Sequence, residues 1–307
     1  MGNIIWLASY PKSGNTWLRT FLSNYLSNSE RPVPINQLNF GWLTTIRERF
    51  DEDVGISSAD MTPREIDLYR PAFHDYLSAQ LEKPSFVKVH DAYTHNARGQ
   101  PLFPGSATAG VIYLVRNPRD VVISYAHHSN WSISRTIREM NCKSAMLSYS
   151  DNGLMSIIHQ RLLSWSQHVR SWTQQTNLPL HVVRYEDMVR SPTKTFTEIV
   201  KFAQLSFSAE RLRQALSFSQ FDRLEAQERV SGFREKASQS RSFFRNGKVS
   251  AWREVLTAAE VELITRHHGE MMKCFNYGET GYDRDNKSRD NNRDSYSALG
   301  DCLVQRA

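Results

Sequence analysis

The sequence predicts an α/β fold, a single three-layer domain built around a central, mostly parallel sheet. The chain has 307 residues, of which 40% are hydrophobic and 23% charged, so it can bury one substantial core. Short apolar segments alternate with segments of helical periodicity, an order typical of parallel strands with helices on both faces. The first apolar segment also leads through a short glycine-containing loop directly into a helix. These three observations indicate the α/β class.

The strands and helices follow from hydrophobic periodicity. Four short apolar runs are predicted strands: residues 4–9, 85–90, 111–115 and 180–184. The segments between and after them place apolar residues three and four positions apart, which predicts helices over residues 15–26, 64–81, 119–129, 154–175, 193–203 and 258–273. Trp165 and Trp172 lie seven positions apart in one of these helices and are interpreted as a buried stripe.

Three of the predicted helices have recognisable starts. A helix often begins after Ser or Thr, with Glu three residues later as a capping box or Pro at the first helical position. These patterns occur as Thr62 with Pro63 and Glu65, Ser191 with Pro192, and Thr257 with Glu260.

No internal repeat or linker divides residues 1–278, so we expect them to form one domain. Residues 279–307 differ in composition, because six acidic and five basic side chains accompany few large apolar ones. That composition predicts a disordered tail.

The net charge points to an anionic partner. It is +6 for the whole chain, and residues 210–253 carry most of it, with ten Lys and Arg against five Asp and Glu. Basic segments with interleaved aromatic residues can bind single-stranded nucleic acid, and they can also bind a small polyphosphorylated ligand. The first loop favours the small ligand, because a non-specific nucleic-acid binder does not need a buried strand-to-helix anion site.

Several classes of protein are not supported. No apolar run approaches the length that spans a membrane. The first residues lack the basic start and small-residue cleavage site of a secretory signal, so we expect a cytoplasmic protein. The three cysteines form no paired motif, and neighbouring histidines such as His127 and His128 point in different directions on a helix, so no metal site is predicted.

The first loop has the composition of a phosphate site. Gly14 allows the backbone to approach an anion, the following helix offers unpaired N–H groups, and Lys12 adds positive charge. Ser13 and Thr16 add hydroxyl donors. In the usual nucleoside-triphosphatase loop a glycine precedes the lysine, whereas here the lysine comes first. A simple tight turn before a helix is the alternative interpretation.

Polar side chains follow every predicted strand. Lys88 and His90 end the second strand, Arg116 and Asp120 follow the third, and Tyr185 follows the fourth. Ligands of parallel sheets bind at the carboxyl ends of the strands. We therefore expect these side chains to share a site with the first loop.

Four segments in this order resemble a known family, the sulfotransferases that use 3′-phosphoadenosine 5′-phosphosulfate (PAPS). They are Tyr-Pro-Lys-Ser-Gly-Asn-Thr-Trp at 10–17, Val-Arg-Asn-Pro-Arg-Asp-Val-Val-Ile-Ser-Tyr at 115–125, Tyr-Glu-Asp-Met at 185–188 and Phe-Phe-Arg-Asn-Gly-Lys-Val-Ser-Ala-Trp-Arg at 243–253. The resemblance extends from about residue 4 to Gly278 and implies a P-loop-like site for the 5′-phosphosulfate. The first of these segments is similar to that of bacterial members, some of which modify natural products.

The resemblance implies roles for individual residues. The co-substrate contacts would be Lys12, Ser13, Gly14, Asn15, Thr16, Trp17, Arg116, Ser124, Tyr185, Ser219, Phe221, Arg245, Asn246 and Gly247. Residues 12–16 would hold the 5′-phosphosulfate, and Arg116, Ser124 and residues 245–247 the 3′-phosphate. Trp17 and Phe221 would enclose the adenine, with Tyr185 and Ser219 nearby. No metal is required, because cationic side chains and the helix N-terminus neutralise the donor.

His90 is the predicted general base. A histidine near neutral pKa can take the acceptor's proton while the acceptor oxygen attacks sulfur. A lone histidine at a strand end is more often structural, but Lys88 lies two residues earlier on the same side of the strand. This Lys-x-His pair resembles the family's catalytic pair. The resemblance implies that Lys88 and Lys12 would stabilise the negative charge that develops during transfer.

The chain departs from the family's pattern at several positions. Asn15 replaces a threonine, Asn246 replaces a lysine, and His90 lies between Val89 and Asp91. The family's dimerisation stretch is echoed only in part, so the chain is expected to be a monomer or a homodimer. Residues 31–61 and 131–151 lack clear periodicity, and we expect them to form the acceptor pocket, with several acidic residues that would suit an amphipathic or cationic acceptor.

The expected reaction is transfer of a sulfonate to a hydroxyl, or to an amine, of a small molecule. A phosphate-loop kinase of small molecules is one alternative, although the loop lacks the glycine before the lysine. A non-catalytic module that binds nucleotides or single-stranded nucleic acid is another.

Overall fold

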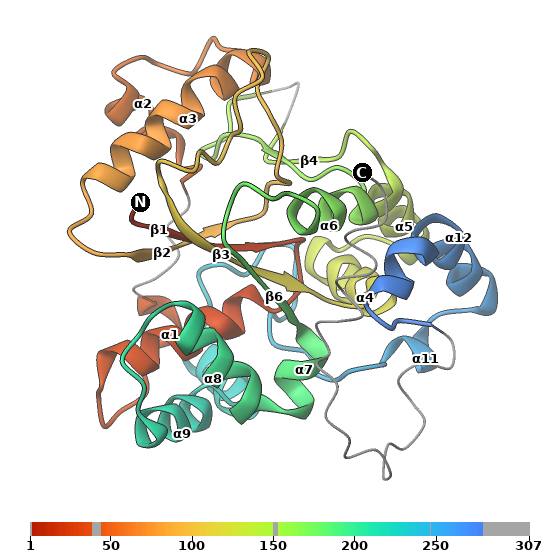
Figure 1. Cartoon of the computed structure of the whole chain (residues 1–307). Helices are drawn as coiled ribbons and strands as arrows, with labels where there is room; N and C mark the ends of the chain where they lie inside the picture. Colours follow the sequence, from red (N-terminus) through yellow and green to blue (C-terminus); the bar gives the residue numbers. More distant parts are fainter. Residues whose placement is uncertain (1, 39–43, 150–152, 246, 279–307) are drawn as a thin grey trace.

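A computed structural model describes residues 2–38, 44–149, 153–245 and 247–278. Its centre is a four-stranded parallel sheet in the order β2-β1-β3-β6 (Figure 1). The strands are β1 (Ile4–Ser9), β2 (Ser85–Val89), β3 (Thr108–Val115) and β6 (Leu180–Arg184). The predicted α/β class and all four predicted strands are therefore confirmed, with changed ends only for β2 and β3.

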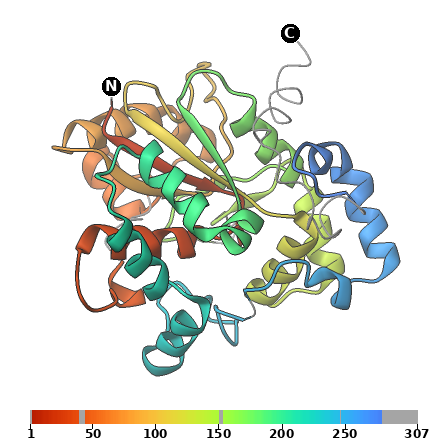
Figure 2. The same ribbon diagram turned by 60° about the horizontal axis from the view of Figure 1, so that its bottom comes forward.

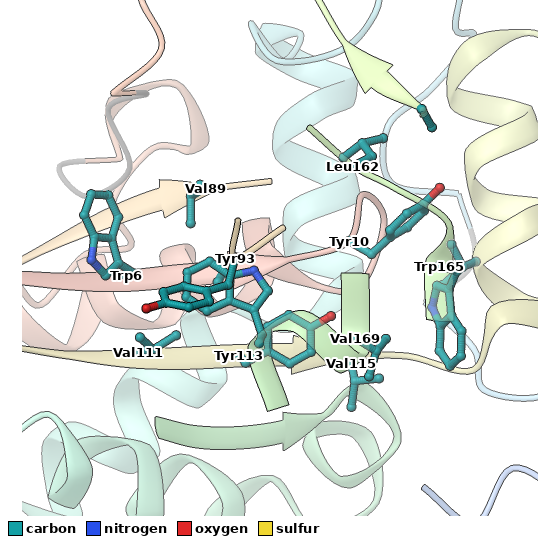
Figure 3. Packing of buried hydrophobic residues seen from close by; sticks show 14 of the residues in the cluster. Trp6, Tyr10, Val89, Tyr93, Val111, Tyr113, Val115, Leu162, Trp165 and Val169 are labelled. Atoms are coloured by element: carbon teal, nitrogen blue, oxygen red, sulfur yellow. The ribbon is translucent and has the colours of Figure 1, made fainter. Parts of the chain in front are cut away.

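β1 lies inside the sheet, between β2 and β3, and all six of its side chains are buried. Trp6 lies beside Val87 of β2 and Val111 of β3, so each edge of β1 is paired. Since side chains alternate along a strand, Trp6 enters the core on one face of the sheet and Leu7 the core on the other. Figure 3 shows the first of these cores around Trp6.

Helices cover both faces of the sheet (Figures 1 and 2). α1 (Asn15–Ser27), α8 (Pro192–Phe202) and α9 (Ala209–Phe218) contribute buried residues to the core around Leu7. The core around Trp6 is closed by α3 (Pro63–Ala79), α4 (Pro118–Ser129), α6 (Trp165–Thr173) and α12 (Ala258–Cys274). The remaining helices are α2 (Arg47–Val54), α5 (Ile133–Asn141), α7 (Tyr185–Arg190), α10 (Phe221–Ser231) and α11 (Trp252–Val255), with a short 3₁₀ turn at Ile35–Gln37.

The prediction of a helix over residues 154–175 is wrong in its first half. Residues Gln160–Arg161 form β5, which pairs antiparallel with β4 (Met146–Leu147). The helix begins only at Trp165, because Ser164 and Gln167 form a capping box that fixes its start. Trp165 and Trp172 are both fully buried, in agreement with the predicted stripe.

The other predicted helix starts agree with the structure. Thr62 and Thr257 make complete capping boxes with Glu65 and Glu260. Ser191 is the N-cap of α8, but its side chain makes no capping hydrogen bond. Among the described residues, no helix combines the length and apolar character needed to cross a membrane.

Candidate active site

A cavity of about 920 Å³ lies at the carboxyl ends of the strands. Most of the residues expected at the site line it: Lys12, Gly14, Asn15, Thr16, Trp17, Lys88, His90, Arg116, Ser124, Tyr185, Ser219, Phe221, Arg245 and Gly247. Ser13 lies just behind this lining, and Asn246 is outside the described residues. The fold thus brings segments separated by more than two hundred positions to one place.

The loop between β1 and α1 has the shape of an anion cradle. Lys12 and Gly14 both have positive φ angles, 68° and 104°. A Cβ atom at Gly14 would lie 2.8 Å from the ring of Tyr185, so only glycine fits between the loop and that ring. Gly14 is the N-cap of α1, and because it has no side chain it makes no capping hydrogen bond to the first N–H groups of the helix. The buried Ser13 hydroxyl has no partner among the described residues. These N–H and O–H groups can bind phosphate oxygens.

The side chain of Asn15 holds the loop against β1. Its side-chain Nδ2 donates to the Leu7 carbonyl at 2.8 Å and to Ser9 Oγ at 3.2 Å. The amide therefore ties the first turn of α1 back to β1. Asn15 fixes the cradle, while its own backbone N–H belongs to the helix N-terminus.

Lys12 stands in a strongly perturbed environment. Its Nζ lies 3.9 Å from the centre of the Phe243 ring, an attractive cation–π contact. Burial, together with the positive charges of Lys88 and Arg116, lowers the pKa of Lys12 to about 7. A bound anion would raise the pKa of Lys12 again, because it stabilises the charged ammonium. The same attraction favours binding of an anion in the loop.

Arg116 connects the loop to the last part of the site. Its two Nη atoms donate to the carbonyls of Lys12 and Lys248, each at 3.2 Å, and its guanidinium lies 4.1 Å above the Tyr185 ring. The Tyr185 hydroxyl in turn donates to the Gly247 carbonyl at 2.9 Å. Ser124, on α4 eight residues after Arg116, is half-buried in the same wall.

Residues expected around the adenine share one side of the cavity. Trp17 packs edge-on against Tyr185, with 5.9 Å between ring centres. Gly247 has a φ of 60°, and a Cβ atom there would lie 2.6 Å from the ring of Phe221. Ser219 is fully buried and its hydroxyl donates to the Ala215 carbonyl at 2.7 Å. The flat rings of Trp17 and Phe221 both line the cavity.

His90 is held in the tautomer that a general base needs. Its Nδ1–H donates to the Ser9 carbonyl at 2.8 Å, and since a carbonyl only accepts, Nε2 is left without a proton. Burial and the neighbouring positive charge of Lys88 hold the pKa of His90 well below its usual range. The backbone is fixed as well: its N–H donates to Gln160 Oε1 at 3.3 Å, and its carbonyl accepts from His168 Nε2 at 3.0 Å.

A buried ion pair supports the turn after His90. Both carboxylate oxygens of Asp91 accept hydrogen bonds from Arg70, at 2.9 and 2.7 Å, and both residues are fully buried. Asp91 also accepts the backbone N–H of Arg161 at 2.9 Å. Asp91 thus forms a structural anchor for the candidate base that precedes it.

Lys88 has a partner that the sequence did not indicate. Its Nζ lies 3.1 Å from a carboxylate oxygen of Glu235, which also pairs with Arg19 of α1 at 2.8 Å. Burial lowers the pKa of Lys88, while Glu235 opposes that shift. The two cations hold the pKa of Glu235 at about 2, so its carboxylate stays ionised. No local motif links positions 88 and 235, so sequence spacing could not reveal this contact.

The acceptor side of the cavity differs from the expectation. Among the described residues, none from 31–61 lines the cavity, and Leu147 is the one contribution from 131–151. Other segments contribute lining residues that the sequence did not indicate: Ile123, Tyr125, His128, Ile157, Gln160 and Phe243. β4, which contains Leu147, pairs with β5, which contains Gln160, so both strands reach the cavity. Residues 44–61 belong largely to α2 and its flanks. Phe244 lines the cavity as well.

Metal ligands are not clustered in the part of the chain that the structure describes. No group of three or more His, Cys, Asp or Glu residues there could hold a metal ion. The expected tail at 279–307 lies outside the described residues.

Comparisons with known proteins agree on one family. The sulfotransferase domain matches residues 3–276. A flavonol 3-sulfotransferase of Flaveria bidentis is 24% identical over 281 residues, covering 86% of this chain and 80% of the relative. Cytosolic sulfotransferase 13 of Arabidopsis thaliana is 25% identical over 275 residues, covering 85% of this chain and 75% of the relative.

Solved structures show a similar fold. A mouse sulfotransferase complexed with PAP superposes with a TM-score of 0.55 at 17% identity, covering 90% of this chain and 88% of that chain. A retinol dehydratase in complex with androsterone and PAP superposes with a TM-score of 0.59 at 18% identity, covering 92% and 83%.

Proposed function

The chain belongs to the sulfotransferase domain family, and we propose from this premise that it transfers a sulfonate from PAPS to a hydroxyl group of a small molecule. Its enzyme class is transferase of sulfur-containing groups. The observation that carries the proposal is the meeting of two features in one cavity. An anion cradle at Lys12 and Gly14 opens beside His90, whose Nε2 is free to accept a proton.

The donor site fits a nucleotide with phosphate groups at two positions. The cradle and Lys12 suit a 5′-phosphosulfate, because the buried Ser13 hydroxyl and the N-terminus of α1 offer donors there. Arg116, Ser124 and Arg245 line the same cavity and suit a 3′-phosphate, for which arginine is a preferred partner. Both superposed structures contain PAP, the abbreviation for adenosine 3′,5′-bisphosphate. Their ligand supports this assignment.

The reaction follows from these positions. His90 Nε2 takes the proton of the acceptor hydroxyl as its oxygen forms a bond to sulfur, and the bond between sulfur and the bridging phosphate oxygen breaks. Lys12 stabilises the negative charge that develops on that oxygen. Lys88, held by Glu235, stabilises the oxygens of the sulfonate in transfer.

The finer features of the proposal rest on analogy. Residues 1–278 form the sulfotransferase domain, and the acceptor is a natural product, as in some bacterial members of the family. A cytoplasmic location is supported by a relative named as a cytosolic enzyme. An amine is a less favoured acceptor than a hydroxyl, because the cavity wall near His90 offers no unpaired carboxylate among the described residues.

A transfer assay tests the proposal. Purified protein is incubated with radiolabelled PAPS and a panel of phenols, alcohols, amines, sugars and peptides, and the expected result is label in at least one acceptor. Calorimetry with adenosine 3′,5′-bisphosphate and with ATP plus magnesium separates the kinase alternative. Tight binding of ATP with magnesium and none of the bisphosphate would refute the proposed donor. Salt-sensitive oligonucleotide binding without any transfer would favour the binding-module alternative.

A further inference from the structure

The lining of the cavity that contains His90 combines apolar residues with uncharged polar ones. Ile123, Tyr125, Leu147, Ile157 and Phe243 supply the apolar surface. Gln160 and His128 line the same cavity, and neither was expected there from the sequence. Uncharged polar groups in an apolar pocket usually fix the orientation of a ligand.

Gln160 is a rigidly placed hydrogen-bond donor. It is 4% exposed, and its Oε1 accepts the backbone N–H of His90, so the NH₂ end of the amide points away from that backbone. The NH₂ group makes no hydrogen bond within the described part of the chain. Because Gln160 lines the cavity, this NH₂ group can donate to an acceptor atom of a ligand bound there.

The strand that carries Gln160 is fixed to the strand end that carries the base. Arg161 donates its backbone N–H to the Asp91 carboxylate at 2.9 Å, and its carbonyl accepts the N–H of Ala92 at 2.7 Å. With the contact between Gln160 and His90, three hydrogen bonds hold β5 against residues 90–92. The amide therefore keeps a constant position relative to His90.

His128 adds a second neutral polar group. It lies on α4 one turn after Ser124, and its ring packs edge-on against Phe243 at 5.9 Å between centres. Burial and the charges of Lys12 and Lys88 lower the pKa of His128 to about 4, so the ring is uncharged at neutral pH. Its side chain makes no hydrogen bond to another residue in the described ranges, and each neutral imidazole can both donate and accept.

The carboxylates of the cavity are already paired. Within the described lining these are Asp120 and Glu235. Asp120 accepts the backbone N–H groups of Ser250 and Trp252, at 2.8 and 3.0 Å, and Glu235 holds Lys88. No carboxylate there is left to bind a cationic acceptor, which favours a neutral one.

We infer that Gln160 and His128 form an acceptor-recognition site for a neutral molecule that carries a second oxygen beside the hydroxyl to be sulfated, as in a catechol or a 1,2-diol. The inference rests on the proposed function. While His90 Nε2 takes the proton of one hydroxyl, the Gln160 amide donates to the neighbouring oxygen and His128 completes the polar contact.

Two isomeric acceptors test this site. Catechol and hydroquinone each have two hydroxyls on one ring, but only catechol has them adjacent. With saturating labelled PAPS under anaerobic conditions, we expect the wild type to prefer catechol by about tenfold in kcat/KM, the effect of one good hydrogen bond. Gln160→Leu, which keeps the size of the side chain, should lower that ratio to near one. His128→Phe should lower it in the same direction.

Controls separate recognition from folding and from the reaction itself. Gln37→Leu changes an exposed glutamine that does not line the cavity, and it should keep the wild-type ratio. Binding of adenosine 3′,5′-bisphosphate by Gln160→Leu shows that the variant is folded. A ratio near one in the wild type, or an unchanged ratio in Gln160→Leu, would overturn the inference while leaving the transfer reaction standing. Absence of sulfation of every acceptor would overturn the proposed function and this inference with it.

Discussion

Binding of the donor nucleotide should take up a proton through Lys12. In the free protein the pKa of Lys12 is lowered to about 7 by burial and by the charges of Lys88 and Arg116, which outweigh the opposing carboxylates of Glu228 and Glu235. A phosphate group placed in the cradle favours the charged ammonium and raises this pKa again. The free and bound states therefore differ in protonation at mildly alkaline pH.

The size of the effect follows from the pKa. At pH 8, about one unit above the pKa of free Lys12, about one tenth of the molecules carry a charged Lys12, so binding should take up about 0.9 proton. Affinity for adenosine 3′,5′-bisphosphate should then fall about tenfold between pH 8 and pH 9. The ligand's own phosphates contribute little, because their second pKa is about 6. The histidines of the cavity contribute little as well, since His90 and His128 have lowered pKa values and are already neutral.

Calorimetry measures the proton count directly. Titrations with adenosine 3′,5′-bisphosphate at pH 8 in HEPES and in Tris, buffers of different ionisation enthalpy, give the number of protons taken up. Lys12→Arg is the matched variant, because arginine stays charged at this pH and should remove most of the uptake. It also isolates Lys12 from Lys88, whose pKa is lowered too. A wild-type uptake near zero, or the same uptake in the variant, would refute the reasoning.

Two further variants test the support of the site. Asp91→Asn leaves the buried guanidinium of Arg70 without its bidentate carboxylate, and should lower the free energy of unfolding in urea by about 3 kcal/mol; a change under about 1 kcal/mol would count against the anchor. Gly247→Ala would place a Cβ atom 2.6 Å from the ring of Phe221 in a backbone of positive φ, and should weaken bisphosphate binding at least about tenfold while the fold is retained; unchanged affinity would contradict this geometry.

Hydrophobic pattern was sufficient to predict the sheet. The strands of parallel sheets are usually buried on both faces, and β1, whose six residues are all buried, stands out as an apolar run with sharp ends. The predicted bounds of β1 and β6 match the structure. The helix predicted over residues 154–175 failed because apolar residues on both sides of β5, such as Ile158 and Leu162, continue the helical spacing of Trp165 and Trp172. The capping box of Ser164 was the local signal that could have corrected it.

The gathering of the site residues was predictable for the same physical reason. Parallel strands end at one edge of the sheet, so Lys12, Lys88, His90 and Arg116 had to lie near one another. Contacts across long sequence separations were not predictable. Glu235 approaches Lys88 from 147 positions away, and Gln160 lies 70 positions from His90.

The most direct test of the central claim compares the wild type with His90→Ala in two measurements on the same preparations. These are transfer of label from PAPS to a good acceptor, and affinity for adenosine 3′,5′-bisphosphate. Removing a general base typically costs about 10²- to 10⁴-fold in rate, so turnover should fall by that factor while affinity for the bisphosphate stays close to that of the wild type. Near-normal turnover in His90→Ala would contradict the account.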